Sequence, residues 1–230
     1  MSEIQNNTFT CPQCGEDGPL QMWTSINVAH DPDARRRIED LSVFEWTCPN
    51  CKKTALVLHP CLYHDPANEF MVWFAPDGEV ADDTRDFSQL NDYTLRTTKT
   101  PNEFREKINI LERHLDDRAL ELTKLILIMQ LSRDNVDVVD VVFHSIDTSG
   151  RFVFVLVHPD GAEQYLRLPP ETYQKFANDV RDYLYTPARG FQTIDLNWAK
   201  DSLELLKDMH QSTLALPKGE PFLCAAFSAM

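Results

Sequence analysis

Residues 11–14 and 48–51 are the part of the sequence best suited to chemistry, because each segment reads C-P-x-C. A C-x-x-C turn presents two sulfur atoms at one vertex, and two such turns complete a tetrahedral set of four ligands for Zn²⁺. Thiolates are soft ligands that favour zinc over calcium or magnesium. We therefore predict one structural zinc ion with no coordination position open to water or substrate. The predicted ligands are Cys11, Cys14, Cys48 and Cys51.

The residues that flank the two cysteine pairs fit tight turns. A proline follows the first cysteine of each pair and stiffens the turn. Gly15 follows the first pair and suits a left-handed backbone. Lys52 and Lys53 follow the second pair, where they could offset the negative charge of a four-thiolate zinc centre. The spacing leaves two alternatives open, a redox-active dithiol and four unrelated buried thiols.

The two knuckles and two neighbouring segments resemble the CpXC family of bacterial and archaeal proteins. The segments are the strand at residues 26–28, with its Asp-Pro helix start, and the Tyr-His-Asp-Pro turn at 63–66. This resemblance covers residues 9–133, and residues 194–199 resemble the C-terminal region that often accompanies the family. It implies a zinc-ribbon-like site at the four cysteines and implies no particular activity or substrate.

The first half of the chain shows strands followed by two helices. Alternating apolar residues predict a strand over residues 20–28, and apolar runs predict strands over 41–47, 54–63 and 70–74. An Asp-Pro pair starts a short helix at Asp31, and an acidic loop is expected over 75–91. Thr100 and Glu103 form a capping box at the next helix start. The helix over 117–131 is apolar almost all round, which favours the centre of a core over half of an interface.

The second half predicts strands over 138–146, 152–158 and 163–168, then helices over 170–185 and 198–209. Strands and helices thus come in runs, which indicates an α+β fold. We expect a zinc-ribbon-like β-sheet with a helical hairpin, followed by an antiparallel β-meander plus helices. The expected domains are residues 1–133 and 134–230.

Composition limits the partners and the compartment. Lys+Arg 22 against Asp+Glu 36 gives a net charge of −14, which disfavours nucleic acid and anionic membranes. The polar N-terminus predicts no signal peptide, and the longest apolar run, residues 125–129, is too short to span a membrane. Cysteines without a disulfide pattern fit a reducing compartment. We therefore expect a cytoplasmic protein.

Three further groups of residues suggest other functions. The sequence His-Asp-Pro occurs at residues 30–32 and 64–66, which suggests a repeated knuckle–strand–turn unit and offers His64 and Asp65 for acid–base chemistry. A turn cap is the simpler interpretation of each Asp. His59, Cys61 and His64 could form a second metal cluster, although no fourth ligand is present. The arginines at 35–37 could touch nucleic acid, but a solvated helix face explains them more simply.

Because the sequence contains no catalytic motif, the leading hypothesis is a protein-interaction or self-assembly module stabilised by zinc. Its expected partner is another protein or a second copy of the chain, with no small-molecule substrate. The apolar helix over 117–131 and the apolar tail over 222–230 motivate this hypothesis. The alternatives are an enzyme that uses His64 and Asp65 beside the zinc ribbon, and a zinc-ribbon factor associated with nucleic acid or transcription.

Overall fold

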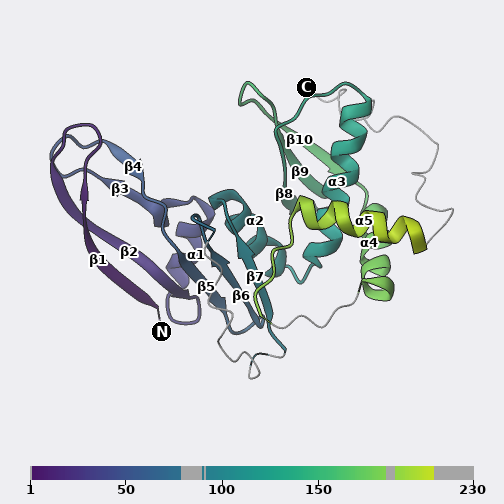
Figure 1. Cartoon of the computed structure of the whole chain (residues 1–230), viewed down its shortest axis with the longest axis horizontal. Coiled ribbons are helices and arrows are strands. Elements are labelled where there is room, and N and C mark those ends of the chain that lie inside the picture. The colour runs from purple at the N-terminus through teal and green to yellow at the C-terminus, as the bar shows by residue number, and fades with distance from the viewer. Residues whose placement is uncertain (1, 79–89, 91, 185–189, 210–230) are drawn as a thin grey trace. The chain divides into compact units, whose positions relative to one another are not determined.

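Runs of strands and helices build two compact units, which the computed structural model describes over residues 2–78, 90, 92–184 and 190–209 (Figure 1). Of residues 207–209 only the backbone is described. Unit 1 comprises residues 1–114 and 188–193, and unit 2 comprises residues 115–187 and 194–230. Within these described residues, five α-helices together with separate sheets confirm the α+β class. The tail at 222–230 and most of the acidic loop at 75–91 lie outside the described residues.

A five-stranded sheet organises unit 1, with strand order β1-β2-β5-β6-β7. Its strands are β1 (Glu3–Thr10), β2 (Asp17–Asn27), β5 (Cys61–Asp65), β6 (Phe70–Phe74) and β7 (Thr94–Thr98). Two pairings, β2 with β5 and β6 with β7, are parallel, and the others are antiparallel. Only the last three residues of β2 pair with β5. The rest of β2 therefore extends beyond the sheet with β1 as a two-stranded ribbon.

A second, two-stranded sheet accompanies this ribbon, together with short helices. These elements are α1 (Pro32–Glu39), the 3₁₀ turn η1 (Ser42–Phe44), β3 (Glu45–Thr47), β4 (Thr54–Leu56) and α2 (Pro101–Leu111). The predicted capping box of α2 is confirmed, since Thr100 Oγ1 accepts from Glu103 N at 3.2 Å and Glu103 Oε2 accepts from Thr100 N at 3.2 Å. Asp31 precedes α1 as predicted, but its side chain makes no cap hydrogen bond.

Two predicted strands of unit 1 are wrong in part. The segment 41–47 contains a 3₁₀ turn before β3, because Leu41 takes a left-handed conformation with φ 61°. The segment 54–63 divides into β4 and β5, and Pro60 in the gap has no N–H to continue a ladder. The predicted strands at 20–28 and 70–74 are confirmed by β2 and β6.

The core of unit 1 follows from strict alternation on its central strands. Every second residue of β5 and β6 is buried, and α2 contributes Phe104 and Ile108 to the same core. One polar network lies beside this core. Tyr63, fully buried on β5, donates its hydroxyl to Glu112 Oε1 at 2.8 Å, and Arg35 Nε donates to both Glu112 oxygens at 2.5 and 2.7 Å. Burial, together with the Glu112 carboxylate, raises the pKa of Tyr63, so its hydroxyl remains a donor.

The outer edge of β7 is covered by a segment from late in the chain. Gln192 N donates to Leu95 O at 3.2 Å, and Thr97 N donates to Gln192 O at 2.8 Å. The buried Arg96 also donates to the Gln192 side chain at 3.4 Å. Unit 1 therefore depends on residues that follow most of unit 2 in sequence.

Unit 2 contains the predicted meander, in the spatial order β10-β9-β8, which is confirmed. Its elements are α3 (Asp117–Arg133), β8 (Asp140–Ile146), β9 (Phe152–Val157), β10 (Glu163–Leu168), α4 (Pro170–Tyr183) and α5 (Leu196–Met209). The interpretation of α3 as a core helix is confirmed, because its apolar residues pack with those of α4 and α5. The helices α2 and α3 lie in different compact units. Two domains divided at residue 133 stay a prediction.

No helix in the described part of the chain is both long and apolar enough to cross a membrane.

We predict that Glu112→Ala lowers the free energy of unfolding by about 2 to 3 kcal/mol, because it leaves the buried Tyr63 hydroxyl and the Arg35 guanidinium without their shared acceptor. Glu39→Ala is the matched control, since Glu39 is 71% exposed and its ion pair with Arg35 is 3.8 Å long. The control should cost less than about 0.5 kcal/mol. Denaturant unfolding of the full chain measures both values, and equal losses would contradict the prediction.

Candidate metal centre

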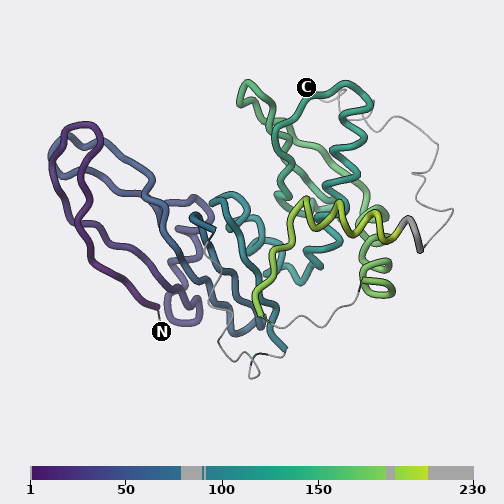
Figure 2. Tube along the Cα trace, viewed as in Figure 1, coloured from purple at the N-terminus to yellow at the C-terminus, as the bar shows by residue number. Residues whose placement is uncertain are grey.

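Two β-hairpins carry the four cysteines, and each hairpin closes a loop of the same length. Thr10 pairs with Asp17 across the first loop, and Thr47 pairs with Thr54 across the second. Side-chain hydrogen bonds reinforce both closures, at 2.6 Å for Thr10 with Asp17 and 3.2 Å for Thr47 with Thr54. The loops at 11–16 and 48–53 lie at the same end of the ribbon (Figure 2).

The backbones of the two loops repeat one another. Gly15 N donates to Cys11 O at 2.9 Å, and Lys52 N donates to Cys48 O at 3.1 Å. The predicted left-handed conformation of Gly15 is confirmed by a φ of 73°. Lys52 takes the same conformation, with φ 61°, although it is not glycine. The two knuckles are therefore equivalent in backbone despite the different residue at this position.

The four Sγ atoms lie close together. All lie within 4.8 Å of one another, with Cys11 Sγ 3.6 Å from Cys51 Sγ and Cys14 Sγ 3.7 Å from Cys48 Sγ. A tetrahedral zinc centre with Zn–S bonds of about 2.3 Å has sulfur–sulfur edges of about 3.8 Å. The four cysteines are thus positioned to hold one metal ion, and all four ligands come from the protein.

The cysteines differ in their exposure to solvent and in their tendency to ionise. Cys11 and Cys48 are buried, Cys51 is half-buried and Cys14 is exposed. Burial disfavours the Cys11 thiolate, but backbone N–H groups of Cys14 and Gln13 and the neighbouring thiols lower the pKa of Cys11 to about 7. The Lys53 N–H favours the Cys51 thiolate, yet burial and the other three cysteines raise the pKa of Cys51 to about 11. Ionisation of one thiol therefore disfavours ionisation of its neighbours, because like charges repel. All four can be thiolates together only if a cation balances their charge.

A small apolar cluster lies under the sulfur atoms and joins the two hairpins. Phe9 packs edge-to-face on Trp46 with ring centroids 5.0 Å apart, and Trp46 Nε1 donates to Pro19 O at 2.9 Å. Gly18 lies against Trp46 and Pro49. A Cβ at Gly18 would lie 2.7 Å from Pro49 Cδ and 2.8 Å from Trp46 Cζ2. Sequence reasoning missed Gly18. The feature that could have identified it is its position, two residues after the first knuckle loop at 11–16.

The structure does not bring His59, Cys61 and His64 together as the second metal cluster that the sequence left open. Within the described residues, the four-cysteine group is the one cluster of three or more His, Cys, Asp or Glu side chains placed to hold an ion. Cys61 faces the core, where burial raises its pKa to about 12. His59 packs on Phe44 with ring centroids 5.2 Å apart, and its Nδ1 lies 2.9 Å from Val57 O. His59 and Cys61 are therefore buried side chains of unit 1.

The structure does not pair His64 with Asp65. Both Asp65 oxygens accept hydrogen bonds from the following turn, including Ala67 N and Asn68 N at 3.1 Å. This confirms the interpretation of Asp65 as a turn cap. His64 extends from the other face of β5, with Nδ1 3.4 Å from Asn27 Nδ2. The imidazole and the carboxylate are not arranged as an acid–base pair.

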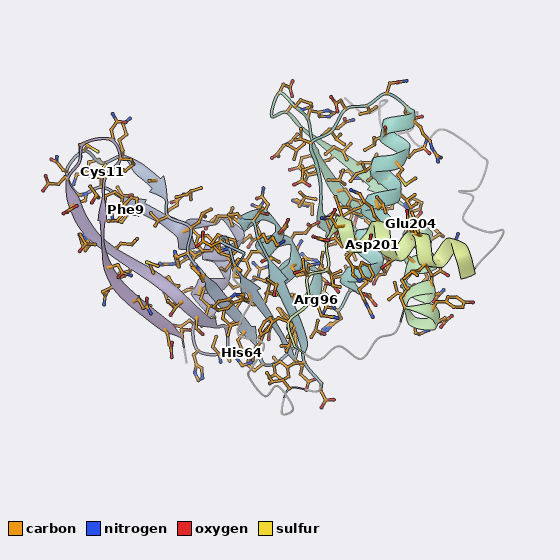
Figure 3. All side chains as sticks on the ribbon, in the orientation of Figure 1. Phe9, Cys11, His64, Arg96, Asp201 and Glu204 are labelled. Carbon is orange, nitrogen blue, oxygen red and sulfur yellow. The ribbon has the colours of Figure 1, made fainter. Side chains whose placement is uncertain are left out.

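His64 also lies far from the cysteines. Its Cα partner in the sheet is Asn27, at one end of the 11-residue strand β2, while the first knuckle precedes the other end. At about 3.3 Å per residue, β2 separates the two positions by roughly 30 Å. Figure 3 shows Cys11 and His64 at opposite ends of unit 1. The two His-Asp-Pro sequences are not equivalent either, because the first follows β2 and the second begins inside β5.

The arginine run occupies the outer face of a short amphipathic helix. α1 buries Ala34 and Ile38, while Arg36 and Arg37 are exposed and Arg35 pairs with Glu112. These positions agree with the interpretation as a solvated helix face.

A comparison with protein families matches residues 9–124 to the model described as CpXC protein. The matched segment includes both knuckles and covers half of the chain. No curated protein and no solved structure matches this chain.

We predict that Gly18→Ala destabilises the ribbon by about 2 kcal/mol, because the new methyl group collides with the rigid rings of Pro49 and Trp46. Gly15→Ala is the matched comparison, since a Cβ there meets nothing within 4 Å and its cost is only the left-handed backbone at φ +73°. That cost should be about 1 kcal/mol. Thermal unfolding of both variants measures which one loses more stability. A larger loss of stability for Gly15→Ala than for Gly18→Ala would contradict the prediction.

Proposed function

This chain belongs to the CpXC family, and from that premise we propose that it holds one structural Zn²⁺ and works by binding another protein or a second copy of itself. The observation that carries the proposal is the closed set of four thiols within 4.8 Å of one another. Because every ligand position of a tetrahedral ion is filled by cysteine, no position remains for substrate.

Zinc is the ion that best fits this donor set. Four thiolates within 4.8 Å of one another favour a soft or borderline ion, and they disfavour calcium or magnesium. When bound, the ion supplies folding free energy to the ribbon by holding its two hairpins together. Lys52 and Lys53 follow the second pair, where their charges offset part of the thiolate charge. Cytoplasm is the compartment we propose, because these thiols must stay reduced to bind metal.

An interaction role follows from what the ribbon presents. The strand β4, which follows the second knuckle, leaves Leu56 58% exposed and the residue Leu58 just beyond it 43% exposed. His64 and Asp65, the candidate acid–base residues, lie at the far end of β2 from the cysteines. A rigid, metal-held element with exposed leucines suits recognition of a macromolecule better than catalysis.

We predict one zinc ion per chain by elemental mass spectrometry of protein purified without added metal. Chelation should melt the ribbon in a separate thermal transition, because the ion joins two hairpins that have little core of their own. Cys48→Ala should abolish zinc retention, whereas Cys61→Ala, a control at a buried cysteine outside the cluster, should keep it. Absence of zinc together with four titratable thiols would support the redox alternative instead.

We also predict that the zinc-loaded full chain either self-associates or captures a defined protein. Size-exclusion chromatography with light scattering tests the first outcome, and cross-linking followed by mass spectrometry tests the second. Loss of the association in Cys48→Ala, with retention in Cys61→Ala, would tie it to the ribbon. A strict monomer that captures no partner would refute the interaction role.

A further inference from the structure

We propose that the outer edge of β4 binds an extended apolar segment of another protein, which pairs with β4 as an added strand and places a carboxylate beside Lys53. This inference rests on the proposed interaction role and names its surface and its partner class. The docking strand comprises residues 54–58, from the start of β4 to the residue Leu58.

The backbone of the docking strand has an open side. Cys48 N donates to Lys53 O at 2.9 Å and Val57 N donates to Phe44 O at 2.8 Å, so residues 53, 55 and 57 face β3. Alternation in an antiparallel pair then turns the N–H and C=O groups of Thr54, Leu56 and Leu58 outward. Within the described chain, β4 pairs only with β3.

The composition of the docking strand is unusual for an exposed edge. It reads T-A-L-V-L, with no charge and no proline. Proteins normally protect such an edge with lysine, proline or a covering segment, because it invites another strand. The two edges of the five-stranded sheet follow this rule. β1 presents polar residues such as Gln5 and Asn6, and β7 is covered by Gln192.

Side chains on both faces of the docking strand suit an apolar partner. Val57 packs under the sulfur atoms with Trp46, so the strand is anchored to the metal centre. Leu56 and Leu58 extend from the opposite face and remain 58% and 43% exposed. An added strand with apolar residues at alternate positions would cover these leucines while its backbone completes the ladder.

The charge next to the docking strand favours a carboxylate at one end of the partner strand. Lys52 and Lys53 precede the docking strand and are exposed, although the chain as a whole carries a net charge of −14. Lys52 Nζ already donates to Pro49 O at 2.6 Å, which leaves Lys53, the residue before Thr54, as the exposed cation at the start of the docking strand. Glu45 is the cross-strand neighbour of Leu56 on β3, the side away from the open edge. A carboxylate on the partner therefore meets Lys53 without meeting Glu45.

A second copy of the chain fits this edge less well. Antiparallel self-pairing centred on Leu56 would place Lys53 opposite His59 of the other copy, so neither lysine would meet a carboxylate. Each copy also carries a net charge of −14, which opposes close association at low salt. The two arguments favour a different protein as the source of the added strand.

The proposal is tested by NMR titration of the zinc-loaded full chain with two synthetic peptides. One peptide alternates threonine and valine and ends in aspartate, and the other is identical but ends in lysine. The aspartate peptide should shift the amide signals of Thr54, Leu56 and Leu58, and should bind about five-fold more tightly than the lysine peptide at low salt. Lys53→Glu should reverse this preference, and Lys99→Glu, at another exposed lysine of unit 1, should not.

Backbone pairing is tested by two variants at one position. Leu56→Pro removes the outward N–H together with the leucine side chain, and it should abolish peptide binding while zinc content is retained. Leu56→Lys keeps that N–H and serves if the proline variant does not fold. It should weaken binding, because it adds charge to an apolar contact.

Three outcomes would overturn the proposal. They are peptide shifts outside residues 52–59, equal binding of the two peptides, and shifts at residues 54–58 that depend on protein concentration without peptide, which would indicate self-pairing. If Leu56→Pro still captures the partner found by cross-linking, the docking strand is refuted while the interaction role stands.

Discussion

Four sulfur atoms crowded at one end of a ribbon are the constraint on which the first half of this protein depends. They come from two hairpins that are far apart in sequence, and they lie within 4.8 Å of one another. β3 and β4 have three residues each, and an isolated two-stranded hairpin is at best marginally stable in water. The apolar cluster beneath the cysteines is small, with Trp46 as its largest member. An ion bound by all four thiols would replace the core that this ribbon lacks.

The rest of unit 1 does not depend on a metal ion for its stability, because its strands and helices bury a continuous apolar core. Phe44, Phe74 and Phe104 pack on one another with centroid separations between 5.0 and 6.3 Å. β2 connects the two regions, since its first part belongs to the ribbon and its last three residues pair with β5. The two ends of β2 are thus stabilised by different contacts, the cysteine cluster at one end and the apolar core at the other. Loss of an ion bound by the four thiols would act on one end of β2, and loss of the Glu112 network would act near the other.

Local spacing made the site predictable, whereas parts of the fold depend on contacts that local sequence does not encode. Each pair of ligands lies within one turn, so C-x-x-C spacing was sufficient to identify the cysteine cluster. β6 is a continuous apolar run and β10 is a short segment between turns, and both were predicted at their observed bounds. β1 was missed because its sequence, E-I-Q-N-N-T-F-T, lacks an apolar face and is an edge strand held by β2. β7 was missed because four of its five residues are Thr or Arg, and three of those four are buried by neighbouring segments.

The two knuckles have the same backbone and different surroundings, which divides their roles. The first is followed by Gly15 and leads into β2, a strand long enough to enter the five-stranded sheet. The second is followed by Lys52 and Lys53 and leads into β4, which pairs only with β3 among the described residues. Lys52 adopts the left-handed conformation, which costs more free energy for lysine than for glycine. The second knuckle therefore carries a positively charged side chain on a strained backbone. The first hairpin therefore connects the cysteine cluster to the five-stranded sheet, whereas the second hairpin leaves one edge of β4 unpaired among the described residues.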